Sequence, residues 1–174
     1  ECAIEYEPAN KALTLSTGNN AEAMRLDSIG AVTMPLQPAF RVAKTSDQTL
    51  DSTSNLTITW QTEVFDVGSN FASNVFTAPV DGKYFFHAQA RLDAIDNNAN
   101  YYLMKIDASN SDCLSIFDPL YTSDLAYQTI SATGVFDMDA NDTAYVYIRQ
   151  NGGSPNSHVD DGNAYTFFCG YLLG

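Results

Sequence analysis

The chain has few basic residues. Its 174 residues include 8 lysines and arginines against 21 aspartates and glutamates, which gives a formal net charge of -13 at pH 7. A field of this sign repels phosphate backbones and anionic lipid head groups, so we expect no nucleic-acid partner. The simplest interpretation of the acidity is solubility, although the same field attracts divalent cations and basic protein surfaces.

Cysteine and histidine are scarce. The three cysteines, Cys2, Cys113 and Cys169, leave at least one thiol unpaired, which does not fit the even disulfide framework of a small secreted scaffold. Cys169 lies among aromatic residues and is expected to be a small buried hydrophobe, with a Cys113–Cys169 bridge as the alternative. No spacing among the cysteines and the two histidines, His87 and His158, suits zinc.

Catalytic and metal-binding motifs are missing as well. No serine stands in a GxSxG or other nucleophile signature and neither histidine has a credible triad, so we expect a non-enzymatic protein without a cofactor. The stretch 137–142 begins like a calcium loop, but Asp142 replaces the required glycine and Ile148 replaces the closing glutamate. Acidic clusters at 93–98 and 160–162 could hold calcium, and solvated turns are the alternative interpretation.

Long hydrophobic runs are also absent. No run approaches the roughly 18 apolar residues that a membrane helix needs, so we expect no membrane insertion. The composition, with 45% hydrophobic and 17% charged residues, is that of a globular protein. No signal peptide stands at Glu1, and we expect the chain to be part of a longer protein.

The chain is instead rich in strand-like runs. They recur about every ten residues and are bounded by clusters of Asn, Asp, Gly and Ser, whereas no window has a convincing helical period. This spacing predicts an all-β sandwich. The expected strands are Leu56–Phe65, Lys83–Ile95, Tyr101–Asp107, Thr129–Met138, Ala144–Gln150 and Tyr165–Leu173.

The first 37 residues have a different character. Two short alternating runs, Ala12–Leu15 and Ala23–Leu26, flank the turn residues Thr17–Asn20, which predicts a β-hairpin. Pro35 and Pro38 cannot continue a hydrogen-bonded ladder and mark a boundary. We therefore expect a hairpin segment over residues 1–37 and the main domain over 38–174. A hairpin this short is marginal in water without neighbours.

Two of the expected strands have apolar side chains on both faces. In the run from Tyr84, the predicted core set is Tyr84, Phe86, Ala88, Ala90 and Leu92, and the opposite set is Phe85, His87, Gln89 and Arg91. In the closing run, Tyr165, Phe167, Cys169, Tyr171 and Leu173 are expected on one face, and Phe168 and Leu172 on the other. An isolated sandwich would leave the second sets in water, which indicates an interface rather than scattered surface aromatics.

Specific motifs carry a family resemblance. The segment Phe76–Pro79, the acidic glycine turn Asp81–Gly82, the run Gly82–Phe86 and the closing run Tyr165–Leu173 together resemble the C1q and tumour-necrosis-factor-like family. The resemblance covers residues 38–174. It implies a ten-stranded-type jelly-roll β-sandwich that assembles as a homotrimer.

The resemblance also implies where copies of the chain meet. In this family the outward face of the inner sheet packs around a threefold axis. The positions of this chain that we expect on that face are Phe85, His87, Gln89, Phe168 and Leu172.

A second surface is expected on the outer sheet and the loops. Tyr101 and Leu103 on one strand, and Tyr145 and Tyr147 on another, point away from the predicted core and could bind a carbohydrate or a protein. Ordinary cross-strand pairing is the alternative interpretation. Loops 93–100 and 152–163 complete this candidate ligand surface with Asp96, Asn98, Asp160 and Asp161.

The segment Met24–Val32 resembles the shaft hairpins of phage tail fibres and related virion appendages. Together the two resemblances suggest a trimeric adhesion or receptor-binding head at the tip of a viral or phage appendage, on the virion surface. Its expected partners are copies of itself, a host-surface glycan or protein receptor, and other virion or fibre proteins. The alternatives are a structural trimerisation, capping or capsid-decoration module without a ligand, and a secreted animal C1q-like lectin or cytokine-like protein.

Overall fold

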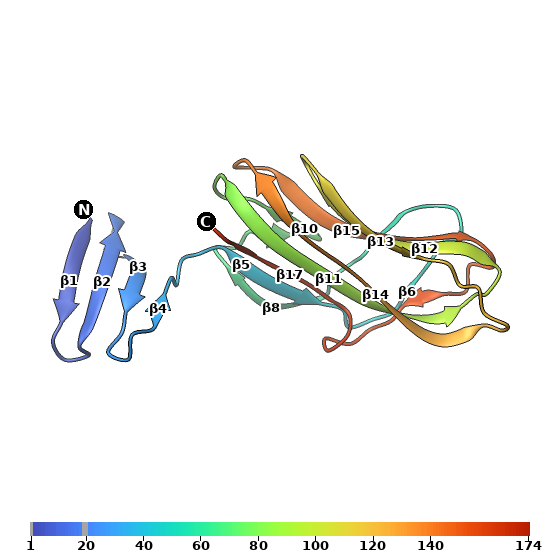
Figure 1. Ribbon diagram of the computed structural model, residues 1–174, viewed down its shortest axis with the longest axis horizontal. Coiled ribbons are helices and arrows are strands. Elements are labelled where there is room, and N and C mark those ends of the chain that lie inside the picture. Colours follow the sequence, from blue (N-terminus) through green and yellow to red (C-terminus); the bar gives the residue numbers. More distant parts are fainter. Residues whose placement is uncertain (1, 19–20) are drawn as a thin grey trace. The chain divides into compact units, whose positions relative to one another are not determined.

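The computed structural model describes residues 2–18 and 21–174, and divides into two compact units, Glu1–Pro38 and Ala39–Gly174 (Figure 1). Regular structure in the described residues consists mainly of β-strands, which are labelled β1 to β17. None of the described segments forms a helix long and apolar enough to cross a membrane.

The first unit is an antiparallel meander. Its strands are β1 (Ala3–Glu7), β2 (Ala12–Thr17), β3 (Ala21–Leu26) and β4 (Val32–Thr33), in the order β1-β2-β3-β4. The predicted runs in β2 and β3 are confirmed as paired strands. The expected turn at 17–20 lies partly outside the described residues. The pairing of β1 and β4 with this hairpin was not expected from the sequence.

The second unit contains two antiparallel sheets. The seven-stranded sheet has the order β6 (Gln48–Thr49), β16 (His158–Val159), β11 (Gly82–Ile95), β17 (Phe167–Leu172), β5 (Ala39–Ala43) and β8 (Thr62–Val67), with β14 (Leu125–Met138) also paired to β11. The six-stranded sheet has the order β13 (Asp112–Phe117), β12 (Ala99–Ala108), β15 (Thr143–Gly152), β10 (Val75–Thr77) and β9 (Phe71–Ala72), with β7 (Leu56–Thr57) paired to β15.

The two sheets enclose one hydrophobic core, which confirms the predicted all-β sandwich. The core set of β11, from Tyr84 to Leu92 at every second residue, is fully buried. An aromatic cluster fills the space between the sheets, where Phe40 lies 5.0 Å from both Phe76 and Phe168 between ring centroids. Aromatic pairs at these distances add to the stabilisation that comes from burying their apolar area.

The expected strand at Leu56–Phe65 is interrupted. Its first part, β7, pairs with the six-stranded sheet, whereas its second part, β8, pairs with the seven-stranded sheet. Between them the chain crosses from one sheet to the other, and the buried side chain of Ile58 and the half-buried ring of Trp60 pack on the core on the way. An apolar run can therefore serve two sheets in succession, which its alternation does not reveal.

Candidate functional site

The outward face of the seven-stranded sheet is largely apolar at its centre, with a few uncharged polar side chains. We call it the central face and define it by Phe85, His87 and Gln89 of β11, Thr133 and Val135 of β14, and Phe167, Cys169 and Tyr171 of β17. The three strands are neighbours, with β11 between β14 and β17 (Figure 1). Val135 is 57% exposed and Tyr171 46% exposed, while Phe85 is half-buried between them.

The strand register groups these side chains into rows. Phe85 lies opposite both Val135 and Tyr171, and its ring centroid is 5.2 Å from that of Tyr171. His87 lies opposite Thr133 and Cys169 in the next row. When His87 is neutral, the eight side chains of the central face carry no formal charge. Arg41 of β5 stands beside them, with its guanidinium 4.4 Å from the ring centroid of Phe167.

The prediction that Phe168 and Leu172 share this face is wrong. The register pairs Phe168 with Ala88 and Leu172 with Tyr84, both of which point into the core, and directly paired residues share a face. Phe168 is fully buried and Leu172 packs against the core cluster. Phe167, Cys169 and Tyr171 take the outward positions instead. The closing run has aromatic side chains on both faces, so its sequence alone did not fix which face is buried.

His87 is held firmly on the central face. Its Nδ1 lies 2.6 Å from the hydroxyl of Thr133, and its ring centroid is 5.4 Å from that of Phe167. Partial burial lowers the pKa of His87, because removing water disfavours the charged ring. At neutral pH the face therefore presents a neutral imidazole to whatever packs on it.

Cys169 and His87 lie opposite each other on this sheet, which raises the question of a catalytic thiol–imidazole pair. The Sγ of Cys169 donates to the backbone carbonyl oxygen of His87 at 3.6 Å, and burial raises the pKa of the thiol. A catalytic cysteine needs the opposite shift. The three cysteines are free thiols, so the alternative of a Cys113–Cys169 bridge is wrong.

Arg91 forms a compact cluster at one end of β11. Its guanidinium lies 3.6 Å from the ring centroid of Tyr165 and 4.6 Å from that of Tyr127, and it pairs with the carboxylate of Asp160. Asp160 is buried as a result. Sequence reasoning placed Arg91 on the outward face but missed these partners, which come from segments far away in the chain.

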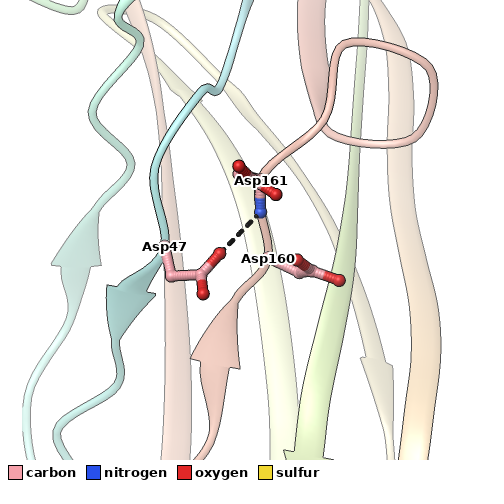
Figure 2. Close-up of side chains that lie close together, drawn as sticks. All are labelled: Asp47, Asp160 and Asp161. Carbon is pink, nitrogen blue, oxygen red and sulfur yellow. Dashed lines mark hydrogen bonds between the residues drawn. The ribbon is translucent and has the colours of Figure 1, made fainter.

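Three aspartates gather next to this cluster. The carboxylate oxygens of Asp47, Asp160 and Asp161 lie within 4.8 Å of one another, and the backbone N–H of Asp161 donates to Asp47 at 2.9 Å (Figure 2). These are hard oxygen ligands of the type that calcium prefers. Asp160 is already neutralised by Arg91, however, and a cation would have to compete with that ion pair.

The candidate ligand residues of the loops differ in how far they are buried. Asn98 is exposed, whereas Asp96 is only 7% exposed and holds two loops together. The backbone N–H groups of Ser154 and Asn98 donate to the carboxylate of Asp96 and lower its pKa. Asp96 and Asp160 are therefore buried structural residues, and their prediction as surface ligand contacts is wrong because distant segments fold over them.

The predicted tyrosine surface lies on the outward face of the six-stranded sheet. Tyr145 and Tyr147 are half-buried, with ring centroids 6.4 Å apart. The hydroxyl of Tyr145 donates to Asp107 at 2.8 Å, and this bond together with burial raises the pKa of Tyr145. The ammonium of Lys105 lies 5.8 Å from the ring centroid of Tyr147.

Leu103 extends this surface toward β13. It is paired with Ile116, and Ile116 and Leu114 are 52% and 51% exposed. Tyr101 lies farther along β12, opposite Asn151. Strand β13 was not expected from the sequence, so the contribution of Leu114 and Ile116 to this surface was missed.

A groove of about 380 Å³ opens beside β8 and β9. Val42, Trp60 and Phe71 contribute apolar side chains, and Gln61 and Glu63 are among the polar residues that line it. The groove can accept an apolar group beside these polar side chains.

Comparison with known proteins identifies the architecture. The family model of the C1q domain matches residues 39–173. No curated protein matches the chain in sequence.

Solved structures share the fold at low sequence identity. The globular domain of zebrafish complement 1qA protein superposes with a TM-score of 0.55 at 16% identity, covering 79% of this chain and 98% of that chain. Murine APRIL at pH 8.5 gives 0.56 at 16% identity, and at pH 8.0 it gives 0.57 at 15% identity, each covering 79% of this chain and 99% of that chain. These similarities confirm the predicted jelly-roll fold of the C1q and tumour-necrosis-factor-like type.

Proposed function

The chain belongs to the C1q family, and on that basis we propose that residues 39–174 form a non-enzymatic homotrimeric head that binds a receptor. The central face carries this proposal. An apolar row of Phe85, Val135 and Tyr171 on a face without a formal charge favours packing against an equivalent surface, since apolar area is buried and no charge loses its water.

A substitution on the central face tests the homotrimer. Phe85→Asp places a carboxylate in the middle of the apolar rows, and we expect the native mass to fall from three chains to one. Tyr147→Asp is the matched control, because Tyr147 is also a half-buried aromatic residue but lies on the other sheet. Light scattering coupled to size exclusion measures both masses, and an unchanged mass for Phe85→Asp would overturn the proposal.

We propose that the receptor is contacted by the loops between β11 and β12 and between β15 and β17. These loops support each other through Asp96 and through the hydroxyl of Ser157, which donates to the carbonyl of Ala94 at 2.8 Å. They therefore present exposed polar residues, such as Asn98 and Asn156, on a fixed base. A host-surface glycan or a protein receptor fits such a surface, and the tyrosine surface around Tyr147 is the second candidate contact.

Trimer formation would multiply weak contacts. Three tethered sites act at high effective concentration and can raise the apparent affinity by about 10²–10⁴-fold over one site. Binding to a glycan array or to cells should therefore be lost in the Phe85→Asp monomer at concentrations where the parent trimer binds. In this proposal the head needs no metal, because Arg91 already compensates Asp160.

We propose further that the head stands at the tip of a viral or phage appendage. The support is the separate strand unit Glu1–Pro38, which is the shaft segment in this proposal. A secreted animal C1q-like protein and a structural capping module are the competing contexts. Deletion of residues 38–174 separates an adhesin from a cap: the particle still assembles but loses host binding in the first case, whereas it fails to assemble in the second.

A further inference from the structure

The two faces of the β1–β4 sheet differ in chemistry. On one face, Arg25 pairs with Glu7 at 3.1 Å and with Glu22 at 2.6 Å, on the same side of the sheet as the buried residues Ala12 and Thr14. The other, which we call the shaft face, is apolar in the middle of the sheet and carries no charged side chain among the paired residues. It consists of Ile4, Tyr6, Leu13, Leu15, Met24, Leu26 and Val32.

The shaft face forms two continuous rows across the strands. In one row Ile4 lies opposite Leu15, which lies opposite Met24. In the other row Tyr6, Leu13, Leu26 and Val32 follow one another across all four strands. Ile4 is 73% exposed, Tyr6 63% and Val32 53%. An apolar surface arranged in rows like this usually marks an interface.

The sheet has too little interior to be stable by itself. Among the described residues of this unit, Ala12 and Thr14 alone are buried. A small sheet without a second layer is marginal in water, because its apolar side chains gain little from folding. Another protein surface must therefore cover the shaft face whenever the unit is folded.

We propose that the shaft face packs against the same face of other copies of this chain. A chain with a net charge of -13 repels its copies, and a contact through seven uncharged side chains avoids bringing like charges together. The Arg25 ion pairs then stay on the outside, in water. This inference rests on the proposed homotrimer, which keeps three copies of Glu1–Pro38 tethered within reach of one another.

Cysteine cross-linking tests this contact directly. Cys2 is an exposed thiol, so every variant in this experiment also carries Cys2→Ser. Leu15→Cys then places a thiol on the shaft face, and Glu5→Cys is the matched control, because Glu5 is exposed on the opposite face of the same sheet. With a short bismaleimide, we expect covalent dimers and trimers from Leu15→Cys and only the background yield from Glu5→Cys. Equal yields from the two variants would overturn the inference.

Native mass separates failure of this inference from failure of the proposed function. If Leu15→Cys is trimeric by mass and gives only background cross-links, the shaft contact is wrong and the trimeric head stands. If the parent chain is a monomer by mass and Leu15→Cys gives only background cross-links, both are wrong.

Limited proteolysis gives a second readout that does not need a new cysteine. Trypsin cleavage after Arg25 should be at least about tenfold faster in the monomeric Phe85→Asp variant than in the parent, since cleavage follows the population of the open unit. Equal protection in monomer and trimer would show that the shaft face is covered within its own chain, which would overturn the proposal.

Discussion

Phe168 gives the sharpest test of how the closing strand is oriented. The ring is fully buried, and its centroid lies 5.0 Å from that of Phe40 and 5.7 Å from that of Phe86. Replacing it with alanine removes these contacts and leaves a cavity between two sheets that cannot easily collapse. Buried Phe→Ala substitutions cost about 3–5 kcal/mol, and we expect about 4 kcal/mol for Phe168→Ala. A chain of this size should then melt roughly 8–16 °C lower.

Phe167→Ala is the matched control, with the same substitution at the adjacent position on the opposite face. Phe167 is half-buried beside Arg41 and His87, so its loss should weaken trimer association and leave the folding of the sandwich largely intact. Circular dichroism in urea at a fixed protomer concentration measures the stability of the fold in both variants, and native mass on dilution measures trimer association. If Phe167→Ala destabilises folding more than Phe168→Ala, the assigned register of β17 is wrong.

Three further predictions follow from the packing and burial of single residues. Gly170→Ala should lower the free energy of unfolding in urea by about 1–3 kcal/mol, because a Cβ there would overlap the ring of Phe86 and approach the carbonyl oxygen of Phe85 to 2.9 Å. An unchanged free energy of unfolding would contradict the tight packing at this position. Burial lowers the pKa of His87 in the folded chain below its usual 6.5. As the pH falls, the unfolded chain therefore binds a proton at His87 before the folded chain does. The free energy of unfolding should then decrease from its value above pH 6.5 as the pH drops through the folded pKa. Comparing urea midpoints at neutral and acidic pH should show a smaller loss in His87→Gln, and an identical loss would refute this cause. Burial lowers the pKa of Lys44 from 10.5 to about 8, so the parent should gain stability between pH 8 and 10.5 relative to Lys44→Met, and the absence of this gain would count against a buried ammonium.

The sequence was most informative where one long strand has a strict alternation. In β11 every second residue from Tyr84 to Leu92 is fully buried, as predicted, because pairing with a strand on each side fixes the alternation along this stretch. The same alternation holds in β12, where Tyr101 and Leu103 were expected to point away from the core and the alternate residues Tyr102, Met104 and Ile106 are fully buried.

The sequence was less informative where burial depends on distant segments. Asp96 is buried by a loop whose Ser154 lies 58 positions later in the chain, and Asp160 is buried by its pairing with Arg91. In β17 both faces are aromatic, so only its register with β11 shows that Phe168 belongs to the core. Local patterns fix alternation, but contacts between distant strands decide which alternate set is inside.

The central claim is that copies of this chain meet through the central face. Sedimentation velocity of the unmodified chain at micromolar concentration tests it most directly. The account predicts a single species with three times the 19.0 kDa chain mass, which dissociates in Phe85→Asp. A stable monomer of the unmodified chain would contradict the account.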